Sequence, residues 1–386
     1  MIVLEHDAKE LLAVQGFPVP GGIQLTQVPK YDNAEAEESS GPWLVKPQIA
    51  SVDGIPPDRI ILATTRREVA DATAQLLGKR IANQTVHAVR VERRFESASA
   101  AYLGFICDPV ASGVRVALES FDAAASGSNG TPHRQSETVA PDPNAVIACV
   151  NRLASGLPTG LRAPVIAAAT QLAPLYFGYE ALQLEIDPLR ILSDGGWIAG
   201  DVRMIIDENA LFRHPEIISM IERRDFAYHE VRRKRAHGID HLVLNPGGTV
   251  GTIATGGGLA SNVIDEIVRR GLLPYNYMEA NPEVIAESTE ALATSLGWLA
   301  EAKKLRVVLV TALDGVVDVT EFARRFSEAI ALTPALTAPI VARFVGENAG
   351  EAEDILRSMP DRISFQRDYN GAFDSLPGYL AGDAPA

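Results

Sequence analysis

The sequence predicts an α/β protein of two or three domains. From residue 240 onward, short apolar segments alternate with amphipathic ones, a pattern typical of strands and helices in a parallel sheet. Earlier in the chain, residues 184–215 have the pattern of two strands joined by a Gly-rich turn at 193–196. A length of 386 residues is sufficient for two or three domains, each with its own core.

In the first half, apolar periodicity and breaker residues place the elements. The expected strands are 22–25, 43–46, 59–63, 86–92, 102–108 and 114–120. The expected helices are 5–16, 67–77 and 163–180. We expect helix and loop at 32–40 and a turn region at 152–161. Residues 123–144 are rich in Ala, Ser, Gly and Pro, so we expect a flexible surface loop there.

Three acids stand out in the strand pair at 184–215. Glu185 and Asp187 lie on the first strand and Asp201 on the second, and a hairpin of this length can place Asp187 opposite Asp201. Carboxylates in apolar surroundings repel one another unless a positive charge lies between them. Mg²⁺ with a phosphate chain would supply that charge. The alternative is a hairpin whose acids face water.

In the second half, the order of elements predicts a parallel sheet. The expected strands are 250–254, 275–279, 306–311, 340–344 and 362–365. The expected helices are 258–270, 282–301, 319–331 and 349–358. The charged segment 217–236 is expected to be a connecting helix and linker, which puts a domain boundary near 237–238. The final residues, 379–386, are expected to be disordered.

Composition limits the function classes. The formal net charge of −14 argues against a nucleic-acid partner, because binding to a phosphate backbone needs a basic surface. No apolar run is long enough for a membrane-spanning helix, and the first residues do not resemble a signal peptide. Two cysteines provide neither a disulfide framework nor a metal cluster. We therefore expect a cytoplasmic protein that contacts no membrane.

Several motifs together resemble one family. EIDPL at 185–189, GDVR at 200–203 and DENALFRHPEI at 207–217 follow one another as in the nucleotide-binding subunits of the ADP- or GDP-forming succinyl-CoA synthetases. The opening segment 6–22 and the segments 41–48, 76–80, 91–108 and 131–143 extend the resemblance. It implies an ATP-grasp region of two α+β subdomains at 1–236. A flavodoxin-like CoA-ligase domain with a disordered tail would follow at 237–386.

The resemblance also implies a nucleotide site for ATP or GTP with Mg²⁺. Lys46 matches the lysine that contacts the phosphates, although a structural salt bridge to one of the acids is the alternative for this residue. Glu92 matches a glutamate on the nucleoside side, and Asp187 and Asp201 match the metal ligands. Gly54 is the glycine that remains of the family's phosphate-binding loop at 50–57, where other glycines, an arginine and a lysine have been replaced.

Loops of the second domain imply a substrate site. Thr255 stands where the family has a substrate-contacting asparagine, and Gly315, Val316 and Val317 match a second glycine loop. Asp318 replaces the arginine of that loop, and Asp314 replaces a glycine. We expect Asp318 to cap the helix that begins at residue 319. A third family loop corresponds to residues 280–282.

The implied function is that of one subunit of an acid–CoA ligase. It would use the Mg²⁺-nucleotide to phosphorylate a histidine on a CoA-binding, alpha-type partner subunit, within a hetero-oligomer that activates a small carboxylic acid. The acidic replacements at 314 and 318 favour a substrate other than succinate. The alternative is a non-catalytic ATP-grasp scaffold or regulatory subunit, which the altered loops favour.

Overall fold

The computed structural model describes residues 1–31, 41–51, 54–82, 84–97, 99–121, 135–280, 288–313 and 318–380. The chain divides into two compact units, Met1–Phe226 and Ala227–Ala386. This division lies before the predicted boundary near 237–238. The reason is that helix α7 (His229–His237), expected as part of a linker, packs against strand β14 (Ile239–Val243) of the second unit.

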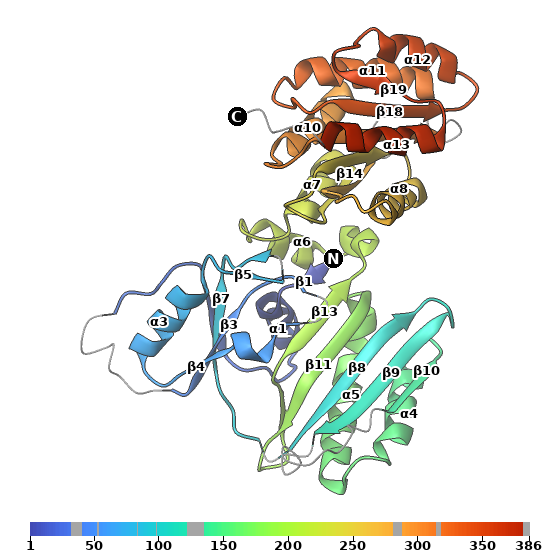
Figure 1. Cartoon of the computed structure of the whole chain (residues 1–386). Coiled ribbons are helices and arrows are strands. Elements are labelled where there is room, and N and C mark those ends of the chain that lie inside the picture. Colours follow the sequence, from blue (N-terminus) through green and yellow to red (C-terminus); the bar gives the residue numbers. More distant parts are fainter. Residues whose placement is uncertain are drawn as a thin grey trace. The chain divides into compact units, whose positions relative to one another are not determined.

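The first subdomain of unit 1 is an antiparallel four-stranded sheet covered by one helix (Figure 1). Its strands, in spatial order, are β2 (Gly22–Leu25), β7 (Val89–Arg93), β3 (Trp43–Pro47) and β4 (Ile61–Ala63). Helix α3 (Arg66–Leu76) begins at an N-cap, Thr65, whose side chain accepts from the backbone of Glu68. It packs on β3, β4 and β7 through an apolar core. The short elements η1 (Pro57–Arg59), β5 (Arg80–Ile81) and β6 (Gln84–Thr85) complete this part.

The second subdomain is a seven-stranded antiparallel sheet. Its path is β1 (Ile2–Val3), β13 (Val202–Ile206), β11 (Ala181–Ile191), β8 (Ser99–Asp108), β9 (Gly113–Phe121) and β10 (Gln135–Val139), with β12 (Trp197–Ala199) also paired to β11. Helices α4 (Pro143–Ala154) and α5 (Thr159–Gly178) pack on it. The elements η2 (Glu208–Arg213) and α6 (Pro215–Glu222) follow β13.

Helix α1 (Glu5–Val14) connects the two subdomains, because it packs on β13 of the large sheet and on β2 of the small one. One side carries the predicted apolar residues. Charged side chains of its first two turns are buried as well, a feature that periodicity alone did not predict. Helix α1 therefore brings buried charges to the junction of the two sheets.

The predicted hairpin at 184–215 is confirmed in outline. The backbone turns at 193–196, where Gly195 has a positive φ of 83° and Leu192 donates to the carbonyl of Gly196. The returning strand is interrupted between β12 and β13, at Gly200 and Asp201.

The loop predicted at 123–144 is wrong from residue 135 onward. There β10 pairs with β9 along its length, and α4 begins with Asp142 as its N-cap. The remainder of that loop, residues 123–134, and the segment 32–40 lie outside the described residues.

Unit 2 is a six-stranded sheet between two layers of helices. The strand order is β14, β16 (Asn276–Ala280), β15 (Val250–Ala254), β17 (Val307–Leu313), β18 (Ile340–Val345) and β19 (Ile363–Phe365). Within this sheet, the described strands pair in parallel except at one edge. There β14, which was absent from the sequence prediction, pairs antiparallel with β16. All five predicted strands of this half are confirmed.

Two apolar cores lie on the two faces of this sheet. One contains residues of α10 (Thr289–Ala300), α11 (Val319–Leu332) and α12 (Ala349–Arg357). The other contains residues of α8 (Gly257–Arg269) and α13 (Tyr369–Leu380). The predicted disorder from residue 379 is therefore wrong for Tyr379 and Leu380, which end helix α13 and pack against that core. Residues 381–386 lie outside the description.

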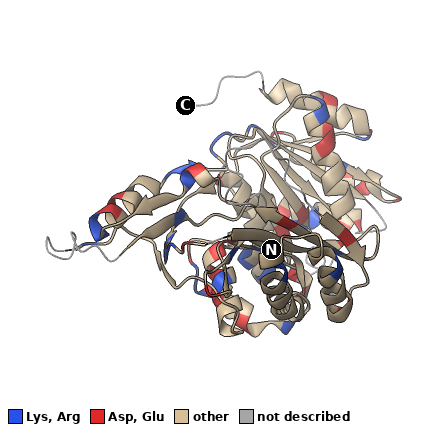
Figure 2. Cartoon of the chain, turned by 90° about the horizontal axis from the view of Figure 1, so that it is seen from below, with Lys and Arg blue, Asp and Glu red and all other residues tan. Residues whose placement is uncertain are grey.

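This architecture is an ATP-grasp fold followed by a flavodoxin-like parallel α/β domain, as predicted. Within the described residues, no helix combines the length and the apolar character needed to cross a bilayer. Acidic and basic residues occur together on exposed helices such as α3, as Figure 2 shows.

Candidate functional site

A buried cluster of charges forms where α1, β3 and β7 meet the β12–β13 bend. Lys46 is 3% exposed, and three oxygens lie within 2.9 Å of its Nζ: Glu5 Oε1 at 2.7 Å, Glu92 Oε1 at 2.8 Å and the Gly200 carbonyl at 2.9 Å. Lys9 contacts the same three groups, with Glu5 Oε1 at 2.6 Å, Glu92 Oε2 at 2.7 Å and Gly200 O at 2.9 Å. Two ammonium groups therefore share one set of acceptors.

An ammonium has three N–H groups, so these contacts match the whole donor capacity of each lysine. Burial alone lowers the pKa of Lys46, but Glu5, Asp201 and Glu92 outweigh burial and hold it above the usual range. For Lys9, burial is the larger influence and lowers the pKa, although Glu5 opposes it. Lys46 is therefore the more firmly charged of the two.

Glu92 is also fully engaged by cations of the chain. Besides the two lysines, its Oε2 accepts from Arg90 Nε at 2.6 Å, and the residue is 1% exposed. Burial alone raises the pKa of Glu92, but Lys9 and the other cations hold it below its usual range. The sequence prediction placed Glu92 toward a nucleoside, whereas in this structure its carboxylate faces Lys9, Lys46 and Arg90.

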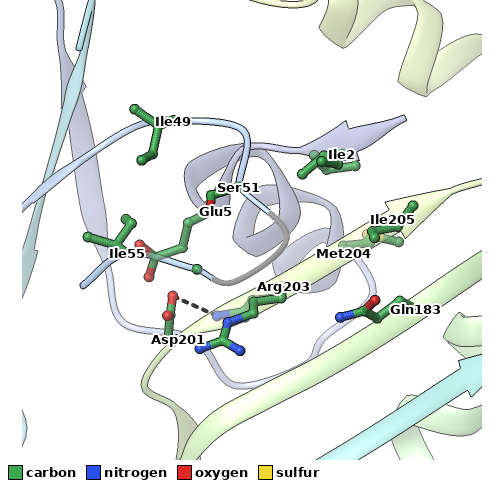
Figure 3. A pocket seen from close by; sticks show the side chains of 13 residues that line it. Ile2, Glu5, Ile49, Ser51, Ile55, Gln183, Asp201, Arg203, Met204 and Ile205 are labelled. Carbon is green, nitrogen blue, oxygen red and sulfur yellow. Dashed lines mark hydrogen bonds between the residues drawn. The ribbon is translucent and has the colours of Figure 1, made fainter. Parts of the chain in front are cut away.

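Asp201 and Glu5 face each other across a small pocket, and Figure 3 shows their carboxyl groups pointing toward one another. Glu5 Oε2 is buried and has no hydrogen-bond donor among the described residues. Burial, followed by the charge of Glu5, raises the pKa of Asp201 to about 8. For Glu5, Lys46 and Lys9 outweigh burial and lower the pKa. At neutral pH Asp201 therefore carries a proton, which it shares with the Glu5 carboxylate.

The pocket itself is narrow. Its space, about 20 Å³, is enough for one water molecule or one ion and too small for a nucleotide. Its walls come from both subdomains: Ile2, Glu5, Ile49, Ser51, Gly54, Ile55, Gln183, Asp201, Arg203 and Met204 contribute to the lining.

Arg203 occupies part of the predicted metal site. Its guanidinium lies 3.5 Å from Asp187 Oδ2 and 3.6 Å from Glu185 Oε2. Gly54, with φ of 78°, passes so close that a Cβ there would lie 2.5 Å from Arg203 Nε. The backbone N–H of Asp187 donates to the Asp201 carbonyl at 3.2 Å, so the two acidic residues are neighbours as predicted. The positive charge expected beside Asp187 is therefore present, and it belongs to the side chain of Arg203.

Among the residues that the structure describes, one further group of three possible metal ligands is found on α1, at His6, Asp7 and Glu10. Arg224 already contacts Asp7 at 2.6 Å and Glu10 at 3.1 Å. Burial, followed by Arg90, lowers the pKa of His6 to about 3, so the ring is neutral. Arg90 can only donate to His6 Nδ1, at 2.7 Å, which leaves the proton on Nε2 beside Glu10. Arg224, Arg90 and the Nε2 proton of His6 therefore already occupy the side-chain atoms that could bind a metal ion.

The substrate residues predicted in unit 2 are only partly described. Thr255 is 1% exposed, and its Oγ1 accepts from the backbone of Leu313 at 3.2 Å, which ties the end of β15 to the end of β17. Gly315, Val316 and Val317, with Asp314, lie outside the described residues, as do 281 and 282 of the third loop. The predicted cap is confirmed, because Asp318 Oδ1 accepts from Thr320 at 2.9 Å and from Glu321 at 3.0 Å.

Sequence reasoning missed three members of the cluster, Glu5, Lys9 and Arg203. Glu5 and Lys9 stand four residues apart, at the border of the apolar side of α1, where an oppositely charged pair on one helix face is the available signal. Arg203 gave no such signal, since its partners depend on strand pairing. The structure therefore brings Lys46, Glu92 and Asp201 together, whereas Asp187 lies beside Arg203.

This fold places the chain among ATP-grasp proteins that have a flavodoxin-like second unit. No family model matches the sequence. The chain is 28% identical over 382 residues to the beta subunit of the ADP-forming succinate–CoA ligase of Nautilia profundicola, covering 93% of both chains. It is 29% identical over 393 residues to the probable malate–CoA ligase beta subunit of Mesorhizobium japonicum, covering 94% of this chain and 93% of the other.

Among solved structures, the fold is similar to that of an ATP citrate lyase from Methanothrix soehngenii. The TM-score is 0.68 at 18% identity, with 99% of both chains covered. The relatives named above are ligases, and the resemblance noted in the sequence is confirmed. Over most of its length the chain is therefore similar to the beta subunits of succinate– and malate–CoA ligases.

Proposed function

We propose that this chain is the nucleotide-binding subunit of an ADP- or GDP-forming acid–CoA ligase. It would act in a hetero-oligomer with a CoA-binding, alpha-type subunit whose histidine is phosphorylated from Mg²⁺-ATP or Mg²⁺-GTP. The observation that carries the proposal is the meeting of Lys46, Glu92 and Asp201, which lie far apart in sequence, with Lys46 Nζ 2.8 Å from Glu92 and 4.0 Å from Asp201. Alignment with ligase beta subunits over most of the chain supports it.

The residues at Asp201 fit a divalent cation. Two facing carboxyl groups, which share a proton that a cation would displace, provide hard oxygen ligands beside a basic side chain. Asp201, with Glu5 beside it, would hold Mg²⁺, and Asp187 would join them by exchanging its contact with Arg203. When bound, Mg²⁺ neutralises phosphate oxygens. Lys46 would hold the phosphate chain, and the buried walls of the cluster would exclude water from it.

Nucleotide titration of the purified chain tests this proposal. Isothermal titration with Mg²⁺-ATP and Mg²⁺-GTP should show binding to the wild type, and Asp201→Asn should weaken it by at least about tenfold, as expected when a metal site is damaged. Asp71→Asn, the same change on the exposed face of α3, should leave binding as in the wild type. Absence of binding at millimolar nucleotide, or equal binding by Asp201→Asn, would refute the nucleotide site.

A second candidate function is a non-catalytic scaffold or regulatory subunit. The specific observation in its favour is that the chain's own charges already complete the site: Lys46 has three oxygen partners, Arg203 lies on Asp187, and the pocket is narrow. A wild-type chain that binds the partner subunit but no nucleotide would establish this alternative.

A further inference from the structure

Lys9 and Lys46 contact the same three groups, Glu5 Oε1, the Glu92 carboxylate and the Gly200 carbonyl. The first lysine comes from α1 and the second from β3. Glu5 has no other cation partner in the described structure, whereas Glu92 also has Arg90 at 2.6 Å. Removing either lysine alone therefore leaves Glu5 with one cation and Glu92 with two, and removing both leaves Glu5 with none.

This duplication matters because Lys46 has no donor to spare. A phosphate can bind Lys46 only if the ammonium gives up one or more of its present partners. A buried carboxylate left without a cation is costly, so a lone lysine in this position would be held in place by Glu5. With Lys9 present, Glu5 keeps a counter-ion at 2.6 Å while Lys46 moves.

We propose that Lys9 is a positioning residue for the nucleotide site: it is the second counter-ion of Glu5, and it frees Lys46 to bind an anionic phosphate chain. This inference rests on the proposed function for its ligand, a nucleoside triphosphate. It concerns a residue that would never touch that ligand. Lys9 acts through Glu5 and Lys46, and no chemistry takes place on it.

A double-mutant cycle on nucleotide affinity tests the inference. Lys9→Met should weaken Mg²⁺-ATP binding by about tenfold in the wild-type background, because Lys46 must then leave Glu5 unpaired. In the Glu5→Gln background the same change should weaken binding by less than about threefold, since residue 5 then carries no charge that needs a counter-ion. Lys79→Met, an equivalent change at an exposed lysine, should leave the affinity unchanged. Equal effects of Lys9→Met in both backgrounds would overturn the inference. If Glu5→Gln alone abolishes binding by damaging the metal site, the denaturation midpoints decide the inference.

Denaturation midpoints provide a readout that needs no nucleotide. Lys9→Met and Lys46→Met should each lower the urea midpoint modestly, and the double variant should lower it by more than the sum of the two. A double variant that fails to fold while both single variants fold would meet the same criterion. Additive midpoints, or a single variant that does not fold, would refute the shared-counter-ion arrangement. A wild-type chain that binds no nucleotide would refute the proposed function, and the midpoints would then decide this inference alone.

Discussion

His6 shows how one buried side chain makes stability depend on pH. Its side chain is 6% exposed, and burial followed by the Arg90 guanidinium lowers the pKa to about 3. The unfolded chain takes up a proton below the ordinary pKa of 6.5, while the folded chain stays neutral. Stability from this residue is therefore fully present above pH 6.5 and is lost as the pH falls toward 3. The loss between pH 7 and pH 5 is about 2 kcal/mol.

We expect His6→Asn to reduce the pH dependence of unit 1 stability by that amount. Urea denaturation at pH 7 and pH 5 measures it in a Trp298→Phe background, where the remaining tryptophans, Trp43 and Trp197, both report on unit 1. His87→Asn, at an exposed histidine, is the matched control and should keep the wild-type slope. An unchanged slope in His6→Asn would show that His6 is not the group responsible.

At the scale of elements, helix α11 begins at a residue whose role was predicted from its position. Asp318 satisfies two backbone N–H groups in the first turn, and it fills the helix N-terminus with a carboxylate of the chain. The start of helix α8 is similar, because Glu279 Oε2 lies beside Gly257 and accepts from the hydroxyl of Tyr277 at 2.9 Å. Both helix starts at this end of the sheet therefore already have a negative charge nearby.

Asp318→Ala should lower the local stability of helix α11 by about 1 kcal/mol, the usual effect of losing an N-cap. Hydrogen exchange of the amides of Thr320 and Glu321 measures this directly. Asp318→Asn keeps an oxygen acceptor and should retain most of the protection. If Asp318→Ala exchanged as slowly as the wild type, the cap would not stabilise the helix.

At the scale of the whole molecule, we predict that the chain alone performs no turnover and that, with its partner subunit, succinate is not the preferred acid. Asp318 stands where the family has an arginine, and one unit charge about 4 Å away matters by about 4 kcal/mol at an effective dielectric of about 20. Glu279 adds a second carboxylate, at the start of helix α8. A neutral, hydroxylated or cationic acid should therefore be accepted better than a dicarboxylate.

Steady-state rates with the reconstituted partner and a panel of acids measure this preference. We expect a lower kcat/KM for succinate than for a hydroxylated monocarboxylic acid of similar size. The highest kcat/KM for succinate would show that the acidic positions do not set specificity. Robust CoA ligation by the chain without any partner would contradict the half-enzyme prediction.

The sequence by itself determined most helices and strands, because apolar periodicity and breaker residues act locally. It also determined the order of motifs, which predicted that Lys46 and Asp201 belong to one site. Strand β10 and helix α13 were missed, since their short or mixed patterns gain stability from neighbours that are distant in sequence.

Only the tertiary structure decided which charges pair. Lys9 and Lys46 are separated by 37 positions in the sequence. Both contact the Glu5 carboxylate only because α1 packs at the junction of the two sheets. In the same way, Arg203 reaches Asp187 through the pairing of β13 with β11. Buried charges require partners at hydrogen-bond distance, and such distances depend on how separate elements pack. A linear motif records the residue types but not these contacts.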